Sequence, residues 1–165
     1  MEIRIEPVPA AQKSVLRQML ELYLYDFSEF SKEDLAENGY FGYTYLDAYW
    51  QEAGRFPFFI RADGRLAGFI LVRSCSEHNP LPDPHNIAEF FVLKKYRRHG
   101  VGKAAAFRIF DRFPGSWEVT QWVSNLPAQR FWEKVVTQYT GGQYRAFSVP
   151  EKEVVGFTFT APPCP

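Results

Sequence analysis

Two hydrophobic periodicities divide the chain into expected strands and helices. Residues 2–8 alternate apolar and polar side chains, which is the pattern of a strand with one buried face. A helical spacing follows, with five apolar residues on one face: Leu16, Met19, Leu20, Tyr23 and Phe27. The aromatic-rich residues before position 57 are interrupted by Gly39 and Gly42, so we expect a loop and a short second helix there.

A β-hairpin is predicted in the next segment. Residues 57–62 and 65–74 are apolar runs joined by Asp63 and Gly64, a pair that favours a tight turn. Three prolines between positions 77 and 86 indicate a loop, and residues 87–93 form another apolar run that we interpret as a strand.

Helices and strands alternate in the second half. Ala106, Ile109, Phe110 and Phe113 have the spacing of a helix lying on a sheet, and Pro114 with Gly115 ends it. Residues 117–123 follow as a strand, which should run parallel to 87–93 because a helix connects the two. Asn125 is placed to cap a further helix with four apolar residues on its buried face: Ala128, Phe131, Trp132 and Val135. After Gly141 and Gly142, residues 145–149 and 154–159 predict a closing hairpin.

Composition narrows the class of protein. A chain of 165 residues with 46% hydrophobic residues suits one domain with a core. Its 19 basic and 19 acidic residues give no net charge, which argues against a nucleic-acid partner. No long apolar run or signal peptide is evident, so we expect no membrane association and a cytoplasmic location. Cys75 and Cys164 suggest neither a disulfide framework nor a metal site, and the three scattered histidines fit no metal pattern.

Residues 87–104 carry the strongest functional signal. An apolar run ends in a basic turn, then come Gly100 and Gly102, and alanines open a helix. A strand that leads into a helix through such a turn leaves main-chain N–H groups unpaired at the positive end of the helix dipole. This arrangement binds phosphate or pyrophosphate, and glycine allows the ligand to approach the main chain.

At this turn the chain resembles the GNAT superfamily of acetyl-CoA-dependent N-acetyltransferases. The family motif Arg/Gln-x-x-Gly-x-Gly/Ala is met by Arg97, Gly100 and Gly102. A second segment, residues 125–134, is similar to the family's Asn-x-x-Ala-x-x-Phe-Tyr helix. Two features depart from the pattern: Trp132 replaces the usual tyrosine, and residues 135–137 replace the usual glycine–aromatic pair.

The resemblance implies an α+β fold with a mixed, mostly antiparallel, twisted sheet of six or seven strands and helices on both faces. Residues 1–160 would form a single domain, and residues 161–165 a loose tail. The implied reaction is acetyl transfer from acetyl-CoA to an amine by direct attack. The alternative is a non-catalytic acyl-CoA-binding or interaction module on the same fold, a possibility raised by Trp132.

The resemblance also implies where acetyl-CoA binds. Its pyrophosphate would lie on the N–H groups of residues 98–103, its pantetheine arm beside residues 90–92, and a main-chain N–H near Phe91 or Val92 would polarise the thioester. The two parallel strands should separate to admit it. The expected cofactor-binding residues are Phe90, Phe91, Val92, Arg97, Arg98, His99, Gly100, Val101, Gly102, Lys103, Asn125, Phe131 and Trp132.

Glu89 is the candidate general base. An amine with a pKa of about 10.4 is protonated at neutral pH and must lose a proton before it attacks. Glu89 lies in an apolar strand, two residues before the expected thioester position, and its surroundings should raise its pKa. Tyr139 or Tyr144 is a candidate proton donor, although the thiolate can leave with little help. Glu89 could instead be a structural carboxylate bonded to loop amides.

Purely structural explanations remain open for the other motif residues. The glycines could simply shape a turn, and Asn125 could be only a helix cap. Phe131 and Trp132 have a spacing that suits the core. A dinucleotide fingerprint also fits Gly100, Gly102 and Ala105, but no acidic residue ends the following strand.

The acceptor is the least defined partner. In the family, the segment after the first helix lines the acceptor pocket, which here places Tyr23, Tyr25, Asp26 and Phe27 there, with Tyr40 and Trp50 as further candidates. Aromatic faces and a carboxylate suit a small cationic amine or an apolar amino-acid amine equally well. The acceptor could be a small molecule or a peptide, and the aromatic excess is compatible with a homodimer.

Overall fold

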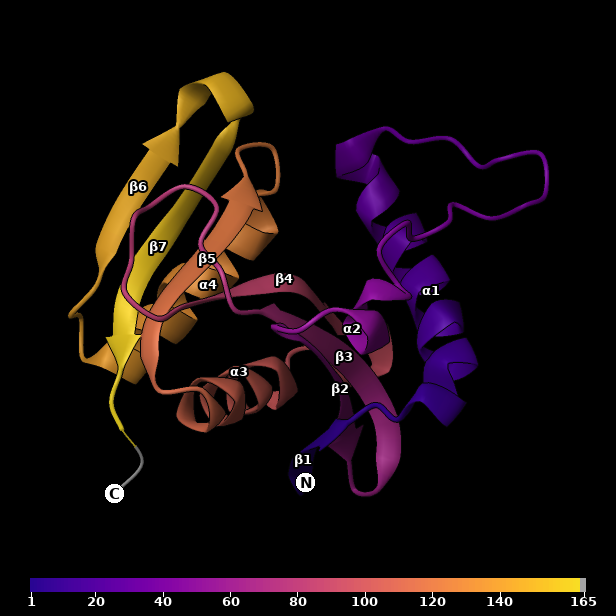
Figure 1. Cartoon of the computed structure of the whole chain (residues 1–165), viewed down its shortest axis with the longest axis horizontal. Coiled ribbons are helices and arrows are strands. Elements are labelled where there is room, and N and C mark those ends of the chain that lie inside the picture. The colour runs from indigo at the N-terminus through magenta and orange to yellow at the C-terminus, as the bar shows by residue number, and fades with distance from the viewer. Residues whose placement is uncertain (164–165) are drawn as a thin grey trace.

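The computed structural model describes residues 1–163, which form one seven-stranded sheet with helices on both faces (Figure 1). The strands lie in the order β1-β2-β3-β4-β5-β7-β6. Their bounds are Ile3–Pro7 (β1), Arg55–Ala62 (β2), Arg65–Arg73 (β3), Pro84–Val92 (β4), Gly115–Trp122 (β5), Arg145–Val149 (β6) and Val154–Ala161 (β7). The α-helices are Lys13–Ser31 (α1), Ala48–Gln51 (α2), Val101–Arg112 (α3) and Leu126–Thr140 (α4).

The first four strands form an antiparallel unit. The β2–β3 hairpin turns at Asp63 and Gly64, whose φ angles of 48° and 76° are both positive. Two positive φ values are what a two-residue hairpin turn needs to match the strand twist. The predicted hairpin is therefore confirmed, although β2 begins two residues earlier than the sequence pattern suggested.

The sheet is mixed at its centre, where β4 and β5 run parallel over a very short distance. Residues 84–86 pair with residues 116–118, and no pairing continues beyond them. Figure 1 shows the two strands diverging from this point. The expected separation of the parallel strands is confirmed. Because the pairing draws residues 84–86 into β4, the strand begins three residues before the expected position 87.

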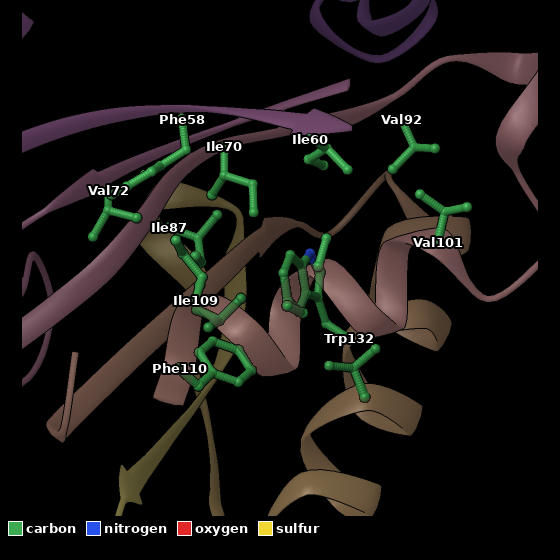
Figure 2. Packing of buried hydrophobic residues seen from close by; sticks show 14 of the residues in the cluster. Phe58, Ile60, Ile70, Val72, Ile87, Val92, Val101, Ile109, Phe110 and Trp132 are labelled. Atoms are coloured by element: carbon green, nitrogen blue, oxygen red, sulfur yellow. The ribbon is translucent and has the colours of Figure 1, made fainter. Parts of the chain in front are cut away.

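Two hydrophobic clusters cover the two faces of the sheet. On one face, Ile109 and Phe110 of α3 and Trp132 of α4 pack against strand residues such as Ile70 (Figure 2). On the other face, Leu16 and Leu20 of α1 belong to a second cluster with Tyr49 of α2. These layers, together with the mostly antiparallel seven-stranded sheet, confirm the predicted fold class.

Some boundaries differ from the expectation. The short second helix exists but is a single turn, and β7 extends to the buried Ala161, the first residue of the expected tail. Cys164 and Pro165, which that tail also included, lie outside the described residues. In the described part of the chain, no helix is long and apolar enough to cross a membrane.

Candidate active site

A cleft of about 640 Å³ opens where β4 and β5 separate. Helices and strands from both halves of the chain contribute lining residues, chiefly α1, β2, β3, β4, β5 and α4. Phe27 of α1 and Trp122 of β5 meet across it with their ring centres 5.0 Å apart. The cleft therefore lies at the one interruption of the sheet, where main-chain groups of β4 and β5 lack a neighbouring strand.

The turn before α3 presents unpaired donors at one end of this region. Arg98 and Gly100 have φ angles of 65° and 78°, and the first bond of the helix joins the N–H of Ala104 to the carbonyl of Gly100 at 3.0 Å. Within residues 1–163, the N–H groups of residues 98–103 donate to no protein acceptor. A side chain on Gly100 would meet no atom within 4 Å, so the space beside it is open. The turn thus has the geometry of an anion site.

The two motif glycines have different roles. Gly100 supplies a left-handed conformation, which L-residues adopt only with strain. Gly102 has an ordinary conformation, but a Cβ there would lie 3.1 Å from the ring of Phe131 in α4. Gly102 therefore permits α3 and α4 to approach each other, and Phe131 acts as its packing partner.

Arg97 is engaged within the protein. Its guanidinium donates to the carboxylate of Asp26 at 2.6 Å and to the carbonyl of Val92 at 2.7 Å, so it joins α1 to the end of β4. Neither Arg97 nor Asp26 lines the cleft. The structure therefore places Asp26 outside the cleft, and Arg97 links α1 to the chain that leads into the turn before α3.

The main chain of β4 offers donors to the open side of the sheet. The N–H of Leu93 donates to Ala67 of β3 at 2.8 Å. Because donors alternate along an antiparallel strand, the N–H of Phe91 also faces β3, while those of Phe90 and Val92 face the gap toward β5. Of the two N–H groups considered from the sequence, the group on Val92 is the one available to a ligand.

Two buried amide side chains line the same cleft without satisfied hydrogen bonds. In the described residues, Oδ1 of Asn86 and both amide atoms of Gln121 have no partner, although each residue is only 5% exposed. Leaving such groups unpaired costs about 1–3 kcal/mol each. A polar ligand with hydrogen-bonding groups of its own would satisfy these atoms.

Glu89 lies on the wall of the cleft formed by β4. The hydroxyl of Tyr23 donates to its carboxylate at 2.5 Å. Burial raises the pKa of Glu89 from 4.5 to about 7, and hydrogen bonds from Tyr23 and Tyr43 only partly oppose this effect. Burial and the nearby carboxylate raise the pKa of Tyr23 well above its usual value, so this tyrosine remains a neutral donor. In the described residues the hydrogen-bond donor to Glu89 is a tyrosine hydroxyl rather than a loop amide.

Loop amides are instead bound by Glu118 of β5, a residue that the sequence did not single out. This carboxylate is 1% exposed and accepts the main-chain N–H groups of Glu77, His78 and Asn79, the first at 2.7 Å. Glu77 and His78 line the cleft. Glu118 thus fixes the β3–β4 loop where it lines the cleft. In the sequence, the only signal for this residue was a charge inside an apolar strand.

The acceptor candidates divide into two groups. Tyr23 and Phe27 line the cleft, as expected. Tyr25 is 69% exposed and points away from it, and Trp50 packs elsewhere while donating to the carbonyl of Val8. Tyr40 lies on the outer side of α1. Residues on one helix face three or four positions apart share an environment, so Tyr23 and Phe27 could face the cleft together while Tyr25 could not.

The α4 residues combine structural and lining positions. Asn125 caps the helix by accepting the N–H of Ala128 at 3.1 Å, and it also lines the cleft. Trp132 is buried against Phe90, with ring centres 4.9 Å apart, and its edge reaches the cleft. The positions of Asn125 and Trp132 are therefore compatible with a structural role, as helix cap and core residue, and also with contact to the cofactor.

Neither tyrosine considered as a proton donor lines the cleft. Tyr139 donates to Asp111 at 2.8 Å and packs in the core beside α3. Tyr144 packs on Phe157 of β7. Both tyrosines line a separate pocket, so their positions do not support either candidate as the proton donor.

Comparison with known proteins agrees with this geometry. The model of the acetyltransferase (GNAT) family matches residues 16–136, and the chain belongs to this family. No curated protein matches the chain.

Among solved structures, the fold is similar to that of an acetyltransferase from Thermus thermophilus, with a TM-score of 0.72, 12% identity and coverage of 97% of each chain. It is also similar to the ribosomal-protein-S18-alanine N-acetyltransferase of Escherichia coli, with a TM-score of 0.63, 11% identity and coverage of 98% of this chain and 95% of that one. A third is an aminoglycoside acetyltransferase in complex with coenzyme A, with a TM-score of 0.67, 12% identity and coverage of 96% and 95%. Identities this low establish the shared fold only.

Proposed function

We propose that this protein transfers the acetyl group of acetyl-CoA to a primary amine by direct attack, with Glu89 as the general base. The observation that carries the proposal is a carboxyl group with a pKa of about 7 on the wall of a cleft at the β4–β5 separation. A base with a pKa near the working pH is the most effective at removing a proton at that pH.

Main-chain groups would hold the acetyl donor. The N–H groups of residues 98–103 bind the diphosphate, and the orphaned amides of Asn86 and Gln121 pair with the pantetheine arm. The N–H groups of Phe90 and Val92 face the thioester carbonyl and stabilise its developing negative charge. Acetyl-CoA supplies the activated acyl group.

Glu89 then prepares the acceptor. Its carboxylate takes a proton from the ammonium group, directly or through water, and the free amine attacks the thioester carbon. A C–N bond forms, the C–S bond breaks, the nitrogen releases its second proton to solvent, and the leaving thiolate takes a proton from solvent. A free thiol has a pKa of about 8.5, so departure as thiolate needs little assistance. This explains how Trp132 can occupy the position of the family's tyrosine.

The test compares Glu89→Gln with Glu33→Gln, an exposed control outside the cleft. With an acceptor panel of amino acids, polyamines, aminoglycosides and peptides, thiol release is measured against a blank without acceptor. Glu89→Gln should lower kcat by about 10²–10⁴-fold, while calorimetry shows unchanged affinity for coenzyme A. The control should match the wild type.

The results also address the non-catalytic alternative. A protein that binds coenzyme A but releases no thiol above the blank with any acceptor would be a binding module. Equal turnover by wild type and Glu89→Gln would instead remove Glu89 from the mechanism while leaving the enzyme assignment intact.

A further inference from the structure

Two arginines stand side by side at the acceptor end of the cleft. The pairing register places Arg55 of β2 directly opposite Arg73 of β3, and Arg73 opposite Asn86 of β4. Both arginines line the cleft, and their side chains are only 17% and 29% exposed. Like charges directly opposite one another destabilise a sheet, so this pair requires a physical explanation.

The hydrogen-bond donors of the two arginines are only partly paired within the protein. Among residues 1–163, Arg55 donates one hydrogen bond to Glu52 at 2.7 Å, and Arg73 donates one to Glu77 at 2.5 Å. A guanidinium group has five N–H donors in a planar fork. The two glutamates are 58% and 44% exposed, so water weakens these pairs. Most of the donors at this end of the cleft therefore remain available.

The aromatic side chains nearby are already paired with a cation. The Arg55 guanidinium lies 5.8 Å from the ring centre of Tyr45 and 5.5 Å from that of Tyr49. The faces of these two rings are thus occupied by the Arg55 cation. This disfavours a cationic acceptor, which the sequence alone did not exclude.

We propose that the acceptor is an amine that also carries a carboxylate, which Arg55 and Arg73 bind while the amine faces Glu89. This inference rests on the proposed acetyl transfer. Arginine forks match a planar carboxylate with two parallel hydrogen bonds. A doubly charged phosphate fits less well, because Glu77 and Glu89 line the same cleft. The substrate class is therefore an amino acid, or a peptide end that presents both groups.

The experiment uses matched acceptors that differ only in the acid group: glycine with glycinamide, phenylalanine with its amide, and 5-aminovalerate with its amide. Rates of thiol release are normalised to the free-amine concentration, because the amide lowers the amine pKa. At least one acid should exceed its amide by tenfold or more in kcat/KM. Phosphoethanolamine, included as a phosphate-bearing amine, should be a poorer acceptor than that acid.

Variants test the assignment to the two arginines. Arg73→Gln and Arg55→Gln should reduce the acid-to-amide ratio about tenfold, chiefly through KM, and Arg73→Lys should retain more of it because it keeps the charge. Arg65→Gln is the matched control, an exposed arginine at the other end of β3, and should leave the ratio unchanged. Thermal unfolding of each variant identifies any loss of folding.

Calorimetry gives a second readout that needs no turnover. The preferred acid should bind to the protein in the presence of coenzyme A, and Arg73→Gln should weaken that binding. Such binding without turnover by any acceptor would support the arginine site and overturn the proposed reaction. Turnover of amides as efficient as that of acids, or a ratio insensitive to both arginines, would overturn the carboxylate inference and leave acetyl transfer standing.

Discussion

The anion-binding turn and the acceptor end of the cleft are built in different ways. At the turn, residues 98–103 are consecutive, and the unpaired donors belong to the main chain. At the proposed acceptor end, four residues that line the cleft come from α1, β2, β3 and β4: Tyr23, Arg55, Arg73 and Glu89. The first region depends on local backbone conformation, whereas the second depends on the sheet bringing distant residues together. Changes at one region should therefore leave the other largely intact.

The largest effect should come from Glu118, which holds the loop at the acceptor end. Glu118→Gln keeps the shape but turns one oxygen into an NH₂ group that faces N–H donors. It should lower the free energy of unfolding by about 2–4 kcal/mol. The acceptor KM should rise while coenzyme A affinity, measured by calorimetry, stays constant. Glu133→Gln, exposed on α4, is the control; a parallel loss of coenzyme A affinity would show that the two regions are coupled.

Glu89, on the β4 wall of the cleft, should make stability depend on pH. Its folded-state pKa of about 7 lies above the ordinary value of 4.5, so the folded protein keeps this proton at pH values where the unfolded chain has lost it. The contribution of this group to stability should therefore decrease between pH 4.5 and 7, by up to about 3 kcal/mol. Chemical denaturation at several pH values should show this decrease in the wild type and a flatter profile in Glu89→Gln. An identical slope in both proteins would mean that Glu89 titrates normally.

At the turn before α3, Gly100→Val should lower cofactor affinity as well as stability. Its φ angle of 78° costs about 1–2 kcal/mol with a side chain present, and relaxation of that strain would redirect the neighbouring N–H groups. The Kd for coenzyme A should rise about tenfold, with acceptor preference unchanged. Gly142→Val places a side chain at a φ angle of 88° in the turn after α4, away from the cleft. This control should lose similar stability but no affinity, and equal Kd changes in both variants would argue against a local role for the turn.

The smallest effect is expected from Tyr23→Phe. The Tyr23 hydroxyl stabilises the charged form of Glu89, so its removal should raise the pKa of Glu89 further above about 7. The acid limb of the pH–rate profile should move to higher pH, with unchanged affinity for coenzyme A. Tyr25→Phe, on the exposed side of α1, should leave the profile in place. A shift toward lower pH would contradict the hydrogen-bond assignment.

Much of the fold was predictable because its signals are local. The alternation in β1, the Asp63–Gly64 turn and the cap at Asn125 each depend on a few adjacent residues, and each element appears where expected. The start of β4 and the end of β7 were displaced because strand pairing, rather than local preference, decides whether residues 84–86 and Ala161 are extended.

The candidate site was predictable to a smaller extent. Glu89 and the glycine turn stood out because each interrupts a regular pattern. Arg55 and Arg73 lie eighteen positions apart in the sequence and become neighbours only through the register of the β2–β3 pair. Asp26 was expected at the acceptor, but its ion pair with Arg97 depends on how α1 crosses the end of β4.

By itself, the sequence determined where strands and helices form and which turn exposes unpaired N–H groups, because periodicity and glycine conformations act over a few residues. The tertiary structure alone decided which charged side chains share the cleft. The reason is geometric: the short β4–β5 pairing opens the sheet, and strand register places Arg55, Arg73 and Glu89 around that opening. Local pattern encodes the turn with unpaired main-chain donors, and long-range packing creates the cleft.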